Sequence, residues 1–433
     1  MEGQRLMNRW IVVVGAILIQ LCLGAIYAWS AFTGKLTAEA GGFEFTKTQT
    51  QLVFSLGLLT FAVVMALFAG RWQKRSGPRI VAFTGGIVLG VGYILAGLSG
   101  SSFWGILIGI GLLGGAGIGL GYVCPIAALM PWFPDKKGLI TGLAVAGFGF
   151  GALIWIKLTS GFKFGPLDLT PGWGGLYAMG WSVSKVWILY GILFAAFVSI
   201  GSRVMVCPPD GYCPEGWVPP EGADAGSTGG IEFTEREMAS TAQFWVLFMS
   251  FFVGATAGLM VIGVIQLFGR DALTARAGMT AQQANTIAGT AMGLFYALMN
   301  GLGRIAWGKI SDWIGRKSSI LLMLLIQGVM MIVFYFIGGI EWGLYVGAAV
   351  IGFNFGGNFA LFPAATADYF GNRNVGTNYP WVFMAYGVGG VVGPLLGGVM
   401  GDARAWMWAF VPAGIACLVM AAVALTLRAP KRA

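Results

Sequence analysis

The chain has 433 residues, of which 57% are hydrophobic and only 10% are charged, against about 25% charged in a typical soluble domain. Its mean hydropathy is +0.79, and 71 residues are glycine. This composition excludes a secreted soluble domain, a disordered chain and a disulfide scaffold, and it predicts an all-α polytopic membrane protein. A membrane β-barrel is excluded too, because the apolar runs are continuous and do not alternate with period two.

The net charge is +9, from 26 basic and 17 acidic residues. The basic residues lie in short loops between apolar runs, so the charge reflects orientation in a lipid bilayer, and no nucleic-acid partner is expected. The five cysteines are scattered and the chain has no histidine, so we expect neither a metal site nor a cofactor. The N-terminus enters an apolar run without a small-residue cleavage site, which favours a first transmembrane helix over a signal peptide.

Twelve apolar segments follow one another, and each has about 20 residues or more, the length that crosses about 30 Å of hydrocarbon. With the N-terminus in the cytoplasm, 17 basic residues fall inside and 8 outside, which predicts that both termini are cytoplasmic. We expect a monomer in the cell (inner) membrane. The segments are residues 10–32, 49–70, 80–99, 103–130, 139–160, 185–206, 241–269, 282–307, 319–339, 343–367, 379–401 and 405–427.

The longest connection, residues 207–240, divides these segments into six plus six. It contains five prolines, six glycines, seven acidic residues and one basic residue, which is typical of an exposed linker, here cytoplasmic with a short helix near 234–240. The predicted domains are therefore an N-terminal six-helix bundle, residues 1–206, and a C-terminal one, residues 241–433. The outer connection 161–184 either covers the external mouth or is a plain loop.

The two halves repeat. GRWQKRSGPR begins at Gly70 and GKISDWIGRK at Gly308, 238 residues later, and both contain the same spaced glycine and charge pattern. PWFPDKKG and DYFGNRNVG echo each other at nearly the same offset, with Phe133 and Phe370 separated by 237 residues. Two motifs at one offset indicate a duplicated six-helix unit, which is typical of transporters with two pseudo-symmetric bundles around a site near the membrane midplane.

The twelve segments, the repeat and the charged loop after helices 2 and 8 resemble the major facilitator superfamily. More narrowly, WFPDKKGL (132–139), NGLGRIAWGKISDWIGR (300–316) and ALFPAATADYFG (360–371) are similar to the oxalate:formate antiporter family and its bacterial monocarboxylate-transporter relatives. The resemblance implies gating roles for the two loops, although Lys74 stands where aspartate is common and Trp313 where arginine is common. The gating residues that it implies are Gly70, Lys74, Arg75, Gly77, Gly308, Asp312, Gly315 and Arg316.

Arg304 is the one basic residue inside an apolar segment, where a charge costs at least about 2.5–3.5 kcal/mol. One reading is structural: Lys309 follows about 7.5 Å along the helix, so the side chain could snorkel to the interface. Against this, the repeat partner of Arg304 is the uncharged Ala66, whereas Tyr296 and Asn300 precede it on the same helix face. The resemblance places a substrate-anion arginine at this position, with Asn300 one turn away as a further donor.

No carboxylate is expected to neutralise Arg304, because all 17 acidic residues fall in loops or near helix ends. The substrate would then supply the negative charge. The oxalate antiporter pattern has a second cation, a lysine on helix 11, where this sequence has Tyr386. One cation suits a monocarboxylate such as lactate, pyruvate or formate, and an oxalate or dicarboxylate exchanger is the alternative.

Aromatic residues complete the site that the resemblance implies. Phe355 and Phe359 are one helical turn apart, and so are Phe383 and Tyr386, although core or lipid packing would explain such residues equally well. Gln20 is a further candidate on the first helix. The aromatic candidates are Tyr27, Tyr122, Phe355, Phe359, Phe383 and Tyr386.

The sequence leaves the coupling open. No histidine is present and no acidic residue is expected at mid-membrane depth, so the usual proton relay is missing. Exchange with a counter-anion, co-transport with a proton (symport) and facilitated diffusion all remain possible, whereas the lack of a phosphate-binding loop argues against ATP-driven pumping. A membrane sensor that binds the anion without moving it is a further alternative, and an enzyme is not expected.

Overall fold

The computed structural model describes residues 7–38, 42–133, 137–161, 174–209, 212, 214, 232–371, 374–428 and 430, without the side chains of residues 130, 137–139, 141 and 376. All regular structure in these ranges is helical, as the composition predicts. Eleven helical runs in the described chain are long and apolar enough to cross a membrane. The fold is that of an all-α polytopic membrane protein.

The twelfth predicted segment, 282–307, is helical but falls outside those eleven runs. It consists of α13 (Ala281–Thr290), the π-helical turn η6 (Ala291–Tyr296) and α14 (Ala297–Ile314). Asn300 and Arg304 lower its hydropathy, so the residues that make this helix a functional candidate also make it the least apolar of the set.

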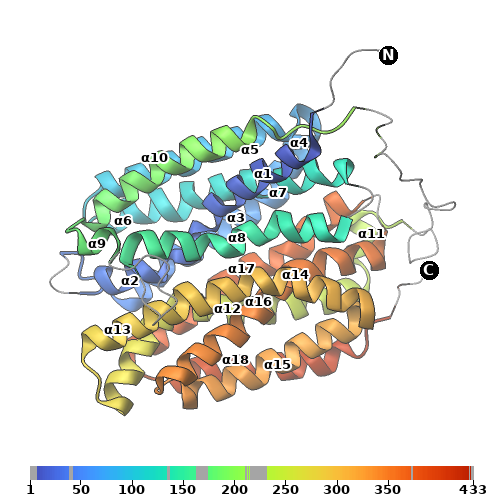
Figure 1. Ribbon diagram of the computed structural model, residues 1–433. Coiled ribbons are helices and arrows are strands. Elements are labelled where there is room, and N and C mark those ends of the chain that lie inside the picture. Colours follow the sequence, from blue (N-terminus) through green and yellow to red (C-terminus); the bar gives the residue numbers. More distant parts are fainter. Residues whose placement is uncertain are drawn as a thin grey trace.

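The first half of the molecule contains the helices drawn in blue to green in Figure 1. Lys47–Ser76 is one continuous run with a π-helical turn, and so is Phe103–Trp132. Its elements are α1 (Arg9–Leu23), the 3₁₀ segment η1 (Gly24–Ala28), α2 (Ser30–Leu36), α3 (Lys47–Val64), η3 (Met65–Ala69), α4 (Gly70–Ser76), α5 (Pro78–Leu98), α6 (Phe103–Ile106), η4 (Leu107–Gly114), α7 (Gly115–Trp132), α8 (Lys137–Ser160), α9 (Gly175–Ala178) and α10 (Val183–Ser202).

The second half, yellow to red in Figure 1, begins after the predicted linker, most of which lies outside the described residues. The short helix expected near 234–240 is present as α11 (Glu235–Ala239). The expected outer connection 161–184 is described only at 161 and from 174 onward. The remaining elements are α12 (Ala242–Ala277), α13, η6, α14, α15 (Arg316–Ile337), α16 (Glu341–Phe370), α17 (Val375–Asp402) and α18 (Trp406–Ala424).

The two halves meet most extensively along two helix pairs, α3 with α17 and α8 with α14, and α2 also contacts α12. Small residues allow close approach there: a Cβ added at Gly149 would lie 2.9 Å from the Cα of Gly301, so the α8 and α14 backbones are nearly in contact. The repeat offset relates α3 to α14 and α8 to α17, so the two interfaces are pseudo-symmetric equivalents.

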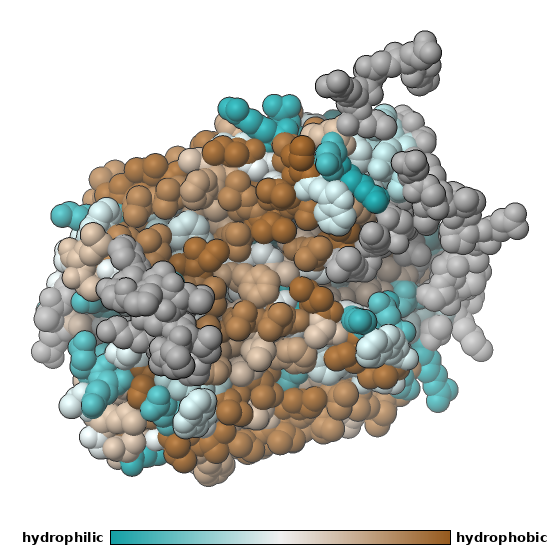
Figure 2. Space-filling model, viewed as in Figure 1, coloured by the Kyte–Doolittle hydropathy of each residue, from teal (hydrophilic) through white to brown (hydrophobic). Residues whose placement is uncertain are grey.

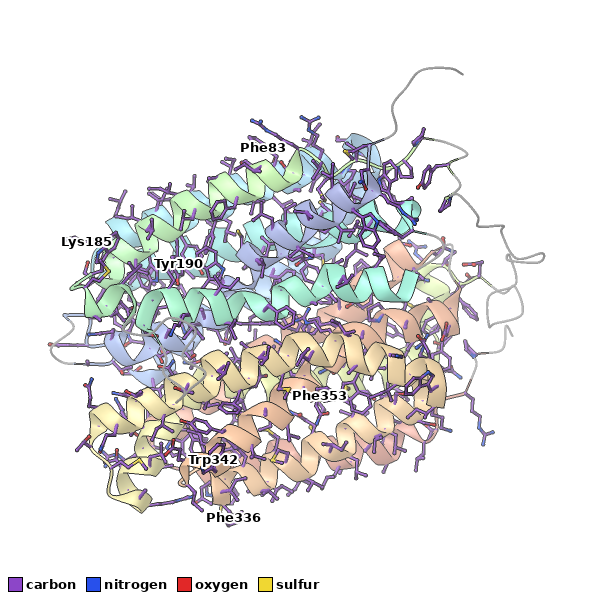
Figure 3. All side chains as sticks on the ribbon, in the orientation of Figure 1. Phe83, Lys185, Tyr190, Phe336, Trp342 and Phe353 are labelled. Carbon is purple, nitrogen blue, oxygen red and sulfur yellow. The ribbon has the colours of Figure 1, made fainter. Side chains whose placement is uncertain are left out.

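Hydrophobic residues cover the middle of the visible surface, and hydrophilic residues gather toward its two ends (Figure 2). Phe83 and Phe336 point outward from the two halves in Figure 3 and are 47% and 62% exposed, which suits contact with lipid. We call the end where α1 begins and α18 ends the terminal face (right in Figure 1), and the other end, near Lys185, the opposite face.

At the opposite face, polar contacts join the halves. Lys47 Nζ forms a 3.0 Å ion pair with Asp271. The backbone N–H groups of Lys47 and Thr48 donate to the carboxylate of Asp402 at 2.9 and 3.0 Å. A second-half carboxylate therefore caps the first turn of α3, and these four residues form what we call the cross-half network.

Candidate functional site

Arg304 is fully buried on α14, with 0% of its surface exposed. Its Nε donates to Asn300 Oδ1 at 3.3 Å, and its Nη1 donates to the carbonyl oxygen of Val145 on α8 at 2.9 Å. The guanidinium lies 4.0 Å above the ring of Phe359, a cation–π contact. The side chain thus turns toward the other half of the molecule, which is inconsistent with snorkelling to the terminal face.

The hydrogen-bonding capacity of Arg304 is only partly used. Nη2 has no hydrogen-bond partner among the described residues, and no described acidic side chain forms an ion pair with the guanidinium. Neutral oxygens satisfy two donors but leave the positive charge uncompensated. A buried guanidinium in this condition is complementary to an anion.

The six predicted aromatic residues come together around Arg304, and all six are buried. The hydroxyl groups of Tyr27 and Tyr386 are 2.9 Å apart across the two halves. Neighbouring rings in the group are in contact. The distances between their centroids are 5.6 Å for Tyr27 and Phe355, 5.3 Å for Phe355 and Phe359, 5.4 Å for Phe359 and Tyr386, and 5.7 Å for Tyr122 and Phe383. The predicted residues therefore form one cluster at the junction of the halves.

Three phenylalanines that the sequence analysis did not select belong to the same cluster. Phe148 lies 5.6 Å from the Arg304 guanidinium, and its ring centroid is 5.0 Å from that of Tyr27. Phe61 packs on Phe383 at 5.3 Å, and Phe251 on Phe383 at 5.9 Å. The one sequence signal was GFGFG at 147–151, where glycines flank Phe148.

Local backbone features position these side chains. Tyr27 lies on the 3₁₀ segment η1, which interrupts the first membrane run. A Cβ added at Gly24 would lie 2.2 Å from the carbonyl oxygen of Phe148, so only glycine allows η1 to approach α8 this closely. The π-helical turn η6, a type of distortion that is frequent at functional sites, leads directly into the turn that carries Asn300.

Two further candidates have other contacts. Tyr296 donates its hydroxyl to the carbonyl oxygen of Gly258 at 3.0 Å, so it joins η6 to α12. Gln20 is buried and donates to the carbonyl oxygen of Tyr122 at 3.1 Å, while its Oε1 has no partner in the described chain. Gln20 therefore supports the backbone behind Tyr122.

The two predicted gating loops differ. In the second copy, Arg316 pairs with Asp312 at 2.8 Å and with Asp368 at 2.9 Å, and it also donates to Ser311. In the first copy, Lys74 and Arg75 are exposed and form no ion pair within the described ranges. Gly77 and Gly315 have φ values of +78° and +83°, so the second glycine of each motif serves the turn in both copies. Gly70 begins α4, and Gly308 lies within α14.

Comparison with known proteins agrees with this architecture. The sequence pattern of the Major Facilitator Superfamily matches residues 10–379 and, in a second match, residues 246–433. The chain is 28% identical to the MFS-type transporter YhjX of Escherichia coli, over 89% of this chain and 86% of that protein. It is 27% identical to the oxalate:formate antiporter of Oxalobacter formigenes, over 96% of this chain and 91% of that protein.

Two further similarities are more distant. The chain is 25% identical to apicoplast pyruvate carrier 1 of Toxoplasma gondii, over 87% of this chain and 81% of that protein. Among solved structures, a bacterial homologue of the human lysosomal transporter Spinster, in an inward-facing and unoccupied conformation, superposes with a TM-score of 0.60 at 17% identity. That match covers 96% of this chain and 95% of the other, and it supports the fold alone.

Proposed function

Because the chain belongs to the Major Facilitator Superfamily, a superfamily of transporters, we propose that it carries small organic anions by alternating access, with the substrate carboxylate bound at Arg304. The observation that carries this proposal is the buried guanidinium between the halves, which has a free Nη2 and no acidic partner among the described residues. A carboxylate would bind Nη2, with Nη1 or Nε released from its present neutral acceptor to complete the fork. Asn300, one turn away, would offer its amide as a further donor.

The preferred substrates in this proposal are monocarboxylates: lactate, pyruvate or formate. Tyr386, a member of the aromatic cluster, lies on α17 at the position where the oxalate antiporter pattern has a lysine, so the cluster around Arg304 has no second basic member. A dianion would bring an uncompensated charge into a buried site, at a cost of several kcal/mol. The relatives include both an oxalate:formate antiporter and a pyruvate carrier, so oxalate is the substrate to test against the monocarboxylates.

The same proposal assigns orientation and movement. The excess of basic residues near the terminal face supports a cytoplasmic position for that face, and we propose the inner membrane as the location of the protein. The opposite face, which the cross-half network closes, is then external. Rocking of the halves about Arg304 would open the site to each side in turn, with a counter-anion, a proton or neither as the coupled species.

The test is counterflow of labelled L-lactate into substrate-loaded proteoliposomes. We expect uptake by the wild type and its loss in Arg304→Gln. Arg304→Lys should also transport poorly, because it keeps the charge but loses the fork. Arg276→Gln is the matched control, since Arg276 lies at the end of α12 and donates to the carbonyl oxygen of Tyr335, away from the site.

The outcomes are distinct. Equal uptake by wild type and a folded Arg304→Gln variant would remove Arg304 from the site. If the protein took up oxalate but not lactate, pyruvate or formate, the oxalate or dicarboxylate exchanger would be favoured. Saturable binding without flux of any of these anions would indicate a sensor. An external pH dependence of net lactate uptake would identify proton co-transport, and dependence on an internal anion would identify exchange.

A further inference from the structure

A second group of buried polar side chains lies within the second half of the molecule, apart from the contacts of Arg304. It consists of Trp307 on α14, Gln327 on α15, and Asn354 and Asn358 on α16, and each is at most 2% exposed. Six of their polar atoms have no hydrogen-bond partner in the described chain: Trp307 Nε1, both Gln327 amide atoms, both Asn354 amide atoms and Asn358 Oδ1. We call these four residues the amide cluster.

Packing contacts place these residues together. A Cβ added at Gly357 would lie 2.5 Å from Trp307 Cδ1 and 2.8 Å from Met323 Sδ, and one at Gly347 would lie 2.1 Å from the ring of Phe334. The chain directions of α15 and α16 are therefore antiparallel in a register that sets Asn354 level with Gln327.

Asn358, the fourth residue of the amide cluster, lies beside the other three. A Cβ added at Gly254 on α12 would lie 2.8 Å from Asn358 Oδ1 and 3.4 Å from Leu324 Cδ2. Leu324 precedes Gln327 by one helical turn, and Met323 shares that face of α15. These contacts place the four residues of the amide cluster in the layer between α12, α14, α15 and α16.

Leaving these atoms unsatisfied would be expensive, because each buried donor or acceptor without a partner costs about 1–3 kcal/mol. Backbone and side-chain polar groups inside a membrane bundle are normally satisfied by protein or by ordered water. The cluster offers three donor nitrogens and three carbonyl acceptor oxygens, and none of its members is charged. This balanced, neutral set matches water, which donates and accepts equally, better than it matches an ion.

We propose that the amide cluster binds ordered water, so that the second half contains a hydrated site beside the substrate region. A buried water makes about three hydrogen bonds, so six atoms correspond to about two molecules. The site adjoins the part of α16 that carries Phe355 and Phe359. Because water exchanges partners readily, it lets this part of α16 move against its neighbours while the amides remain satisfied.

Hydroxyl-radical footprinting of the purified full-length protein in detergent, read by mass spectrometry, tests the proposal. Radicals generated by an X-ray pulse in bound water oxidise the adjacent side chains even when bulk solvent does not reach them. Met323 is 1% exposed and lies beside Trp307, whereas Met260 on α12 is 0% exposed and packs against Gly393 and Gly397. We expect Met323 and Trp307 to be oxidised at least several-fold faster than Met260.

A variant of the amide cluster tests whether water bound there causes the oxidation of Met323. Gln327→Leu combined with Asn354→Leu removes four of the six atoms, so oxidation of Met323 should fall to the rate of Met260 while that of Met260 is unchanged. If this variant does not fold, Gln327→Met alone should lower the rate partially. The proposal would be overturned if Met323 in the wild type were oxidised no faster than Met260, which would indicate direct pairing between the amides. It would also be overturned if the folded variant showed undiminished oxidation of Met323.

Discussion

Tyr386 determines the charge balance of the candidate site at the scale of single residues. Its hydroxyl is 2.9 Å from that of Tyr27, and its ring centroid is 5.4 Å from that of Phe359, on which Arg304 stacks. A basic side chain at this position would lie close enough to Arg304 to share a dianion with it. The number of buried cations would then decide between a monocarboxylate and a dicarboxylate.

Tyr386→Lys tests this charge argument. We expect the apparent affinity for oxalate to rise by about tenfold or more, roughly 1.4 kcal/mol, because the second carboxylate gains a partner. Lactate affinity should change much less, since a monoanion has one carboxylate and leaves the new lysine without a second carboxylate to bind. Competition between unlabelled oxalate and labelled lactate measures both changes. Tyr386→Phe, which removes the hydroxyl without adding charge, is the control, and an unchanged oxalate affinity in the lysine variant would refute charge matching.

At the scale of elements, the contact between η1 and α8 holds two aromatic residues of the cluster in place. It depends on Gly24, whose position leaves no space for a side chain beside the carbonyl oxygen of Phe148. Tyr27 and Phe148 extend from these two segments and touch edge to face at 5.0 Å. Separating η1 from α8 would therefore move Tyr27 away from both Arg304 and Tyr386.

We expect Gly24→Ala to destabilise the protein by about 1–3 kcal/mol, the usual cost of overpacking, and to reduce transport more than its loss of stability alone explains. Gly34→Ala on α2 is the matched control, because a Cβ there meets no atom within 4 Å. Thermal unfolding in detergent and initial counterflow rates measure the two effects. Normal stability and normal transport in Gly24→Ala would show that η1 shifts without consequence for the site.

For the whole molecule, the sequence predicts the membrane class, the twelve helices and much of the aromatic cluster, because length, hydropathy and motif similarity are local signals. It does not predict contacts between distant segments. Val145 binds Arg304 through its backbone carbonyl, which any residue type would provide. In the sequence, Phe148, Phe61 and Phe251 cannot be told from other phenylalanines of membrane helices, and only helix packing brings them to the cluster. Asp402 binds the N–H of Lys47 across 355 positions, a separation at which a single sequence shows no pairing.

The cross-half network makes a prediction about the conformational equilibrium of the molecule. Lys47 is 14% exposed and Asp271 25%, and Asp402 accepts from two N–H groups and from Thr48 Oγ1 at 2.6 Å. Thr46 is the N-cap of α3, and Asp402 adds a second capping contact to the first turn. If this contact is comparable to an N-cap, which contributes about 0.5–2 kcal/mol, Asp402→Ala should raise the fraction of molecules open at the opposite face by about 5- to 30-fold for a loss of 1–2 kcal/mol.

A cysteine at Ser55 reports this opening, because Ser55 is 1% exposed and its hydroxyl faces the carbonyl oxygen of Val391 across the halves at 3.4 Å. In a background with the five native cysteines replaced, a membrane-impermeant maleimide added from outside should label Ser55→Cys faster when Asp402→Ala is also present. Asp312→Ala at the terminal face is the control, and it should not speed labelling by maleimide that is added from outside. Equal labelling rates with and without Asp402→Ala would mean that helix packing, and not the cross-half network, keeps the opposite face closed.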